Sequence, residues 1–425
     1  MIRTLAALVA GLVAVAGCAT ATVPPTPQTT GPTTIRFQSL AFQNPTVAAT
    51  KRIVADWNAA HPDITVRLNQ GSFDSVHNQL VTQFMSGSAP DVIHDESVDI
   101  TGFARQGYVA DLTPYLSPEL RAAIPQGLWD TVTVDGRIVG VPIMMQSYVV
   151  FANTDLLAGV GVPEGQTLTW DALADLARRA TTDTHKGLGW GLRQPTATVM
   201  SLGLNFGGGF FSGSGDAVTF AVGDAELEVP RRIHDMAWVD GSLDTTSLTQ
   251  SGSDVLKGFL NGRYAMIVGG SFLAQQLTET APPGFHWTVL PALSGSADPT
   301  SARQSANPQV LSVAVDSPAI AQSARFVEHV VQPANLAALT QGEWLIPSSM
   351  PARAAVAAAT HGQNGWAGTL AGAQHMVRAP FQSVQRYPQW KDRIATPALQ
   401  RYLGNRIDLP TLRAQLTEGW QQVAR

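Results

Sequence analysis

Two adjacent carboxylates, Asp95 and Glu96, are the residues whose type and position most clearly suggest binding chemistry. They follow a short apolar segment at residues 91–94, which is typical of a buried strand. Each ionised carboxylate accepts several hydrogen bonds, so the pair could hold vicinal hydroxyl groups. A capping or surface role is the alternative. A metal site built with His94 is disfavoured, because adjacent strand residues point to opposite faces and no second cluster of ligands accompanies them.

Alternating strand and helix patterns provide the frame for these carboxylates. Strand-like segments at residues 35–40, 64–68 and 91–94 are separated by helix-like segments, the first of which covers residues 46–58. This order predicts an α/β fold with a parallel sheet. In such sheets ligands bind beyond the carboxyl ends of the strands. The same rule selects three polar residues after the first two strands: Gln43, Asn44 and Ser72.

Composition excludes several functional classes. A chain of 425 residues is expected to form more than one domain, because a single core seldom grows that large. The formal net charge of −5 provides no basic field for nucleic acid. One cysteine excludes an internal disulfide framework and a multi-cysteine zinc site. The sequence has no P-loop, serine-hydrolase elbow or zinc-protease helix motif. We therefore predict no metal, no cofactor and no nucleic-acid partner.

The single cysteine, Cys18, ends a segment typical of a secretory signal. Arg3 precedes an apolar run at residues 5–16, which is too short to span a bilayer. Residues 15–18 read VAGC and resemble the bacterial lipobox, in which the signal is cut before a cysteine that takes a diacylglyceride. An ordinary signal peptide with an incidental cysteine is the alternative.

The segment after Cys18 is rich in threonine and proline, as expected of an extended tether. We expect residues 1–17 to be a signal peptide and residues 18–33 a lipid-anchored tether. The mature protein is then held on the extracytoplasmic face of the cell membrane, on the periplasmic or cell-wall side.

Ordered motifs run through residues 35–350, and each is weak alone but specific in this order. They read FMSGSAPDV at residues 84–92, DGRIVGVP at 135–142, VFANTDLL at 150–157 and FLNGRYAM at 259–266. Together they resemble the family 1 extracellular solute-binding proteins of ABC importers, in particular the carbohydrate-uptake branch related to maltose-binding protein. The tail beyond residue 350 matches only vaguely.

The resemblance implies a periplasmic-binding-protein-like α/β fold. Two lobes with an interleaved chain and a hinge would enclose a ligand cleft. It implies lobe 1 at residues 34–144 and 305–344, and lobe 2 at residues 145–304 and 345–425. The implied partners are a carbohydrate ligand and ABC permease subunits with a cytoplasmic ATPase, and the implied receptor is a monomer without enzymatic activity.

The resemblance also suggests ligand contacts in the middle of the chain. Gln146 lies at the first implied crossing between the lobes. Residues 205–210, with Phe206 and Gly208, resemble a glycine-rich turn that faces the cleft, although a simple tight turn is the alternative. Ser271 and Phe272 match a Gly-Ser-Trp motif in which phenylalanine replaces tryptophan. This replacement keeps a flat face and removes the indole donor.

Aromatic and polar residues elsewhere complete the predicted site. Sugar rings present flat faces that stack on aromatic side chains. Trp190 and Trp238 lie near glycine-rich or polar segments, where a binding platform and a structural role are both open. Trp344 is favoured because it falls at the third implied crossing. Asn307 precedes the implied return strand. Arg378 could bind an acidic or hydroxyl-rich ligand, although simple exposure to solvent is the stronger alternative.

We therefore expect a receptor that captures an oligosaccharide, an amino sugar or another sugar derivative and delivers it to a permease. A receptor of the same class for a glycerophosphodiester or another non-sugar solute is the first alternative. A secreted carbohydrate-active enzyme is the second. It would need two carboxylates on either side of a glycosidic bond, which the adjacent Asp95 and Glu96 do not easily supply.

Overall fold

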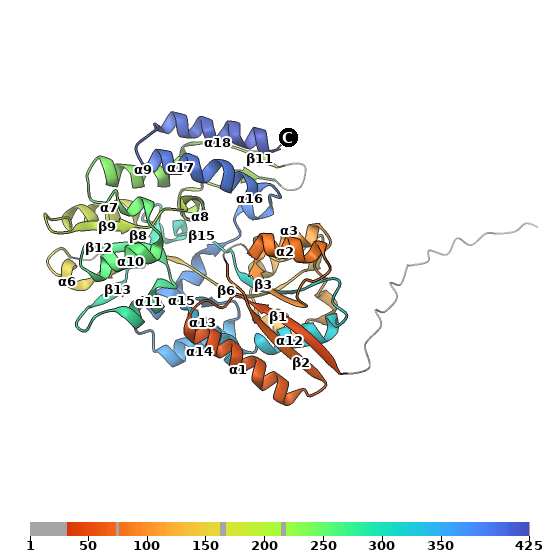
Figure 1. Ribbon diagram of the computed structural model, residues 1–425. Coiled ribbons are helices and arrows are strands. Elements are labelled where there is room, and N and C mark those ends of the chain that lie inside the picture. Colours follow the sequence, from red (N-terminus) through yellow and green to blue (C-terminus); the bar gives the residue numbers. More distant parts are fainter. Residues whose placement is uncertain (1–31, 74–75, 162–166, 214–217, 425) are drawn as a thin grey trace, which may run out of the picture.

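The computed structural model describes residues 32–73, 76–161, 167–213 and 218–424, which form two lobes (Figure 1). The predicted signal peptide, Cys18 and nearly all of the predicted tether lie outside the described residues. Within the described ranges, no helix has the length and apolar character needed to cross a membrane.

A six-stranded sheet in the order β17-β6-β16-β3-β1-β2 forms the centre of lobe 1. β1 is parallel to β2 and β3, whereas β16 is antiparallel to β3 and β6. The predicted parallel arrangement of the first three strands is therefore confirmed. The strands are β1 (Thr33–Ser39), β2 (Ile64–Gln70), β3 (Val92–Glu96), β6 (Val141–Met145), β16 (Gln309–Val313) and β17 (Ile346–Pro347).

Helices cover both faces of this sheet (Figure 1). The face of α1 toward the sheet carries the buried residues Ile53, Val54 and Trp57, at the spacing of an amphipathic helix. Trp57 and Phe37 both contact the ring of Phe326, at centroid distances of 5.5 and 5.3 Å. The helices are α1 (Asn44–Ala60), α2 (Val76–Met85), α3 (Ser97–Arg105), α4 (Pro118–Ala123), α5 (Gln126–Asp130), α12 (Ile320–Val330) and α13 (Pro333–Glu343).

Lobe 2 contains a four-stranded sheet in the order β13-β7-β12-β9. Its strands are β7 (Tyr148–Asn153), β9 (Lys186–Trp190), β12 (Tyr264–Gly270) and β13 (Trp287–Val289). Its helices before the return to lobe 1 are α6 (Thr154–Leu157), α7 (Trp170–Arg179), α8 (Pro195–Gly203), α9 (Asp224–Trp238), α10 (Gly252–Leu260) and α11 (Leu273–Thr280).

The C-terminal helices pack on lobe 2, where α17 and α18 lie at the end far from lobe 1 and α16 lies on the side facing α3 (Figure 1). They are α16 (Tyr387–Trp390), a π-helix (Lys391–Ala395), α17 (Thr396–Leu403) and α18 (Leu409–Ala424). Trp390 is fully buried among residues of α8, α9 and α17, so this tail is part of the core of lobe 2.

Three short segments carry the chain between the lobes. The first joins β6 to β7, the second joins β15 (Gln304–Ser305) to β16, and the third follows β17 and α14 (Met350–Thr360), which packs on α13. α15 (Trp366–Ala371) and β18 (Met376–Val377) follow, and β18 pairs in parallel with β15. The smaller remaining strands are β4 (Thr133–Val134), β5 (Arg137–Ile138), β8 (Thr167–Thr169), β10 (Phe211–Ser212), β11 (Thr219–Phe220) and β14 (Ala292–Ser294).

The buried side chain of Gln304 joins the first two of these segments. The Tyr148 N–H donates to Gln304 Oε1 at 2.7 Å, and Gln304 Nε2 donates to the Tyr148 carbonyl at 2.8 Å. On the side of β7 away from β12, no strand pairs with Tyr148. There the Gln304 amide forms both hydrogen bonds that a paired strand would form with the Tyr148 backbone.

We predict that Gln304→Ala destabilises the protein by about 1–3 kcal/mol for each backbone group left unsatisfied. Urea unfolding should show a lower midpoint. The exposed Gln422 on α18 is a matched control, and Gln422→Ala should stay within about 0.5 kcal/mol of the wild type. Equal stability of the two variants would contradict this role for Gln304.

Candidate functional site

A cavity of about 920 Å³, including the part open to solvent, lies between the lobes. It is bounded on one side by the carboxyl end of β3 and the start of α3, and on the other by α8 and the segment around α16. Its lining residues are Glu96, Val98, Asp99, Asn307 and Gln309 from lobe 1, Gln146 from the first crossing, and Tyr148, Ala197, Ser201, Ser305, Phe381, Tyr387, Pro388 and Lys391 on the side of lobe 2.

Acidic and amide groups form the wall on lobe 1. Asn307 Nδ2 donates to Glu96 Oε2 at 2.9 Å, and its Oδ1 accepts from the Ser97 hydroxyl at 2.9 Å. Asn307, in the segment just before β16, therefore orients Glu96. Burial and the nearby Asp99 raise the pKa of Glu96. Asp99 also lies 2.7 Å from His77 Nδ1, and this contact raises the pKa of His77.

Asp95 does not line the cavity, although the sequence predicted that it would act there beside Glu96. Successive strand residues point to opposite faces, so the two side chains diverge. Asp95 is 1% exposed, and its Oδ1 accepts the Glu96 N–H at 2.8 Å. In the described part of the chain, its Oδ2 has no hydrogen-bond partner. Burial and the neighbouring Asp99 raise the pKa of Asp95 to about 8.

Aromatic residues form the wall on lobe 2. The rings of Phe381 and Tyr387 stack with centroids 4.9 Å apart, and Pro388 follows directly. Tyr148 completes this wall, and its backbone is held by Gln304. Burial raises the pKa of both tyrosines, so their hydroxyls stay protonated at neutral pH.

Three predicted residues, Glu96, Gln146 and Asn307, line this cavity. None of the other lining residues was predicted from the sequence. Asp99 could have been found from its position in the first turn of the helix after Glu96, and Tyr148 from its closeness to Gln146. Phe381, Tyr387 and Lys391 belong to the tail that matched the family only vaguely, so no signal pointed to them.

The residues predicted after the first two strands lie elsewhere. The Gln43 N–H donates to Glu343 Oε1 at 3.0 Å, so Gln43 anchors the start of α1 to α13. Asn44 is the exposed first residue of α1, and Ser72 is exposed beyond β2. None of the three lines the cavity.

Two predicted residues near glycines lie inside lobe 2 and not at the cavity. Trp190 is 1% exposed and stacks on Trp170 at 6.0 Å. A Cβ atom at Gly208 would lie 2.7 Å from the Ala225 carbonyl, so close packing explains this glycine.

Phe206 and Trp238 are also outside the cavity lining. Phe206 is half-buried, with its ring under the Arg232 guanidinium at 5.1 Å. Trp238 is 43% exposed at the end of α9, and its indole N–H donates to the Leu403 carbonyl at 2.8 Å.

Of the remaining predicted residues, Ser271, Phe272 and Trp344 are packed near the crossings, and Arg378 is on the surface. The N–H of the buried Ser271 donates to the Ser147 carbonyl at 2.8 Å, and Phe272 packs against the cores of both lobes. Trp344 is buried and stacks on Trp366 at 4.7 Å. Arg378 is exposed and donates to the Ser383 hydroxyl at 2.9 Å.

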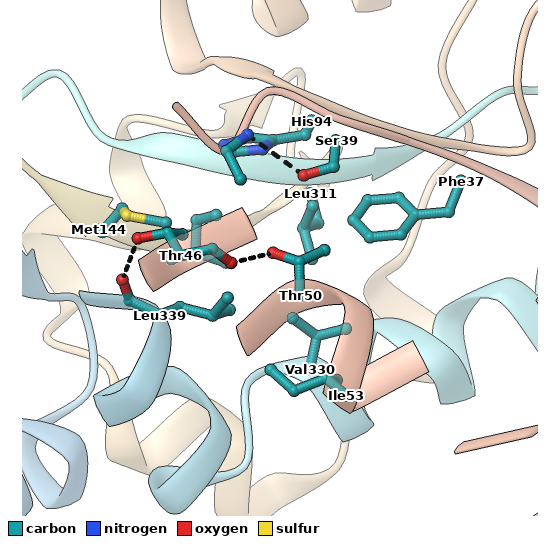
Figure 2. Close-up of a pocket in the computed structure, with 12 residues that line it drawn as sticks. Phe37, Ser39, Thr46, Thr50, Ile53, His94, Met144, Leu311, Val330 and Leu339 are labelled. Atoms are coloured by element: carbon teal, nitrogen blue, oxygen red, sulfur yellow. Dashed lines mark hydrogen bonds between the residues drawn. The ribbon is translucent and has the colours of Figure 1, made fainter. Parts of the chain in front are cut away.

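A second, smaller cavity lies inside lobe 1, between the sheet and α1 (Figure 2). Its polar groups already bond to one another or to nearby backbone. The Thr46 hydroxyl donates to the Leu339 carbonyl at 3.1 Å, the Thr50 hydroxyl to the Thr46 carbonyl at 2.8 Å, and Ser39 Oγ accepts the Ala41 N–H. This space is therefore a packing defect of the core, and the cavity between the lobes is the better candidate site.

We predict that Asp95→Asn stabilises the protein increasingly as the pH rises from about 4 to about 8. Folded Asp95 keeps its proton up to about pH 8, whereas the unfolded chain loses it near pH 4, so the wild type loses stability across this window. The difference between variant and wild type should grow by at least about 1.4 kcal/mol, the value of one pKa unit.

Urea unfolding at several pH values measures this difference. The exposed Asp183 provides the control, and Asp183→Asn should show no such trend. A difference between Asp95→Asn and the wild type that is constant from pH 4 to pH 8 would refute the assignment.

Solved structures with sugar and phosphodiester ligands share this fold. An ABC substrate-binding protein of Listeria monocytogenes in complex with cycloalternan aligns with a TM-score of 0.74 and 20% identity, over 92% of this chain and 98% of that one. UgpB of Mycobacterium tuberculosis in complex with glycerophosphocholine aligns with a TM-score of 0.76 and 16% identity, over 92% of this chain and 97% of that one. The predicted periplasmic-binding-protein-like α/β fold is thereby confirmed.

A comparison with known sequences finds a relative of higher identity than these solved structures. The chain is 40% identical over 416 residues to an uncharacterized lipoprotein in the oleD 5′ region of Streptomyces antibioticus, covering 97% of this chain and 90% of that protein. A model of the bacterial extracellular solute-binding protein family matches residues 43–337. As the ordered motifs predicted, the chain belongs to the family of bacterial extracellular solute-binding proteins.

Proposed function

We propose that the protein is the substrate-binding lipoprotein of an ABC importer and captures a carbohydrate in the cavity between its lobes. The observation that carries this proposal is the composition of the cavity, with carboxylate and amide groups on lobe 1 and aromatic rings on lobe 2. Sugars present hydroxyl groups and flat apolar ring faces, which these two kinds of side chain bind. The Listeria protein of similar fold is in complex with cycloalternan.

Closure of the lobes is the signal that the permease and its cytoplasmic ATPase would read. A ligand that contacts Glu96 on one lobe and Tyr387 on the other favours the closed state over the open one. The three crossings act as the hinge, because they are short segments at the ends of strands. The moving units are residues 34–144 with 305–344 and residues 145–304 with 345–425, in one monomer.

A glycerophosphodiester is the second candidate ligand. Lys391 lines the cavity and offers a positive charge to a phosphate group. Phosphate sites in proteins usually carry bidentate arginines, and no arginine is among the described lining residues. We therefore prefer a carbohydrate.

The receptor binds its ligand without converting it. Incubation with oligosaccharides, followed by chromatography, should return each sugar unchanged. A hydrolysed product formed by the purified protein would favour the carbohydrate-active enzyme instead.

We predict that an oligosaccharide ligand raises the melting temperature, because it binds only the native state. Gln146→Ala should then weaken binding about fivefold, since loss of one neutral hydrogen bond costs about 1 kcal/mol. Titration calorimetry with the sugar that gives the largest thermal shift measures this, with Gln422→Ala as the control. If no sugar shifts the melting temperature, the carbohydrate assignment is wrong.

We predict that Cys18→Ala moves the protein from the membrane fraction to the soluble fraction of the producing cells. The reason is loss of the only sulfur that could carry a lipid. Cell fractionation with immunoblotting tests this, and Thr20→Ala should leave the protein on the membrane. Equal membrane association of both variants would show that Cys18 is not the anchor.

A further inference from the structure

The cavity between the lobes carries more negative than positive charge. Glu96 and Asp99 line it from lobe 1. Lys391 is the one lysine or arginine among the lining residues that the structure describes. It comes from lobe 2, and its ammonium lies 3.5 Å from the Asp392 carboxylate, which offsets its charge.

The carboxylate of Glu96 has no cationic partner within salt-bridge distance among the described residues. Asp99 has His77 at 2.7 Å, whereas Glu96 is bonded to the neutral amide of Asn307. A buried carboxylate that is held only by neutral donors is stabilised further by a cation that comes with the ligand.

Tyr387 is a second and independent feature of the cavity. It is only 5% exposed, yet it lines the cavity, with its ring stacked on that of Phe381 at 4.9 Å. Its environment includes the charges of Glu96 and Asp392 and the hydroxyl of Tyr148. Because Tyr387 lines the cavity, its aromatic ring and hydroxyl are available to a ligand that enters it.

Aromatic rings beside a carboxylate are the arrangement that recognises ammonium groups. The negative faces of tyrosine and phenylalanine rings attract a cation, and a nearby carboxylate adds a full charge. Here Tyr148, Phe381 and Tyr387 line the same cavity as Glu96.

We propose that the ligand of this cavity is a hydroxylated molecule with a positively charged ammonium group, and that this group lies between Glu96 and the rings of Tyr148 and Tyr387. This inference rests on the proposed receptor function and narrows its ligand class to hydroxylated solutes that carry an ammonium group. A primary ammonium of an amino sugar and the quaternary ammonium of a choline ester share this chemistry.

Calorimetric titration with matched ligands tests the proposal. Chitobiose carries two amines, N,N′-diacetylchitobiose carries the neutral amides, and cellobiose carries hydroxyls at the same positions. We expect chitobiose to bind at least tenfold more tightly than the two neutral disaccharides, and to lose affinity as salt is added. The affinity for glycerophosphocholine, compared with that for glycerol 3-phosphate, tests the same preference for a quaternary ammonium.

Two variants separate charge from shape. Glu96→Gln keeps the side-chain length and should weaken binding of the cationic ligand more than binding of neutral sugars, so that the preference for the cationic ligand is lost. Asp183→Asn, at an exposed position outside the cavity lining, should retain the full preference. Equal melting temperatures of the unliganded proteins would show that Glu96→Gln acts on binding and not on folding.

The possible outcomes separate the ammonium site, its placement at Glu96 and the receptor function. A preference for chitobiose or for glycerophosphocholine that Glu96→Gln abolishes supports the ammonium site and identifies its source. Neutral disaccharides that bind as tightly as chitobiose overturn the ammonium site and leave the sugar receptor intact. A preference that survives in Glu96→Gln overturns the placement at Glu96. Failure of all five ligands to bind overturns this inference, and the wider sugar screen by thermal shift then decides the receptor function separately.

Discussion

The whole molecule depends on the way the chain crosses three times between two sheets. β6 ends lobe 1 and β7 begins lobe 2 with only Gln146 and Ser147 between them. β12 pairs with Tyr148 on one side of β7, and on the other side Gln304 from the second crossing supplies a donor and an acceptor to the Tyr148 backbone. One side chain thus ties two crossings together and holds the backbone of one residue of the aromatic wall.

The two walls of the cavity differ in how rigidly they are held. Glu96 is fixed by the Asn307 amide from the neighbouring segment, and that amide is fixed in turn by Ser97. The aromatic wall is built from α16 and the residues before it, which are packed into lobe 2 through Trp390. Each wall is therefore preorganised within its own lobe, so the cost of binding falls mainly on the motion of the lobes and not on the ordering of side chains.

The fold was largely predictable because its early strands and helices follow simple periodic patterns. β1, β2, β3 and α1 were all visible as alternating or amphipathic segments. The site was less predictable. Glu96 was found from its place after a strand, but the same rule included Asp95, whose side chain points to the other face. Tyr387 and Lys391 come from a short helix and a π-helix without a periodic pattern.

Trp190 illustrates a different reason why a residue's role could not be predicted from the sequence. Glycines around a tryptophan can indicate either an open binding loop or a tightly packed strand. Here the glycines permit packing, since a Cβ atom at Gly189 would lie 2.6 Å from the ring of Tyr264, and one at Gly187 would clash with the Ala177 backbone. Periodicity alone cannot separate these cases, because the distinction lies in residues far away along the chain.

The interleaved order of the strands also has a consequence for how the protein is made. The central strand β16 of the lobe 1 sheet begins at Gln309, and the edge strand β17 ends at Pro347. During synthesis from the N-terminus, β16, the shared neighbour of β3 and β6, is made more than 160 residues after β6, nearly two fifths of the chain later. The lobe 1 sheet therefore cannot be completed until most of the polypeptide has been synthesised.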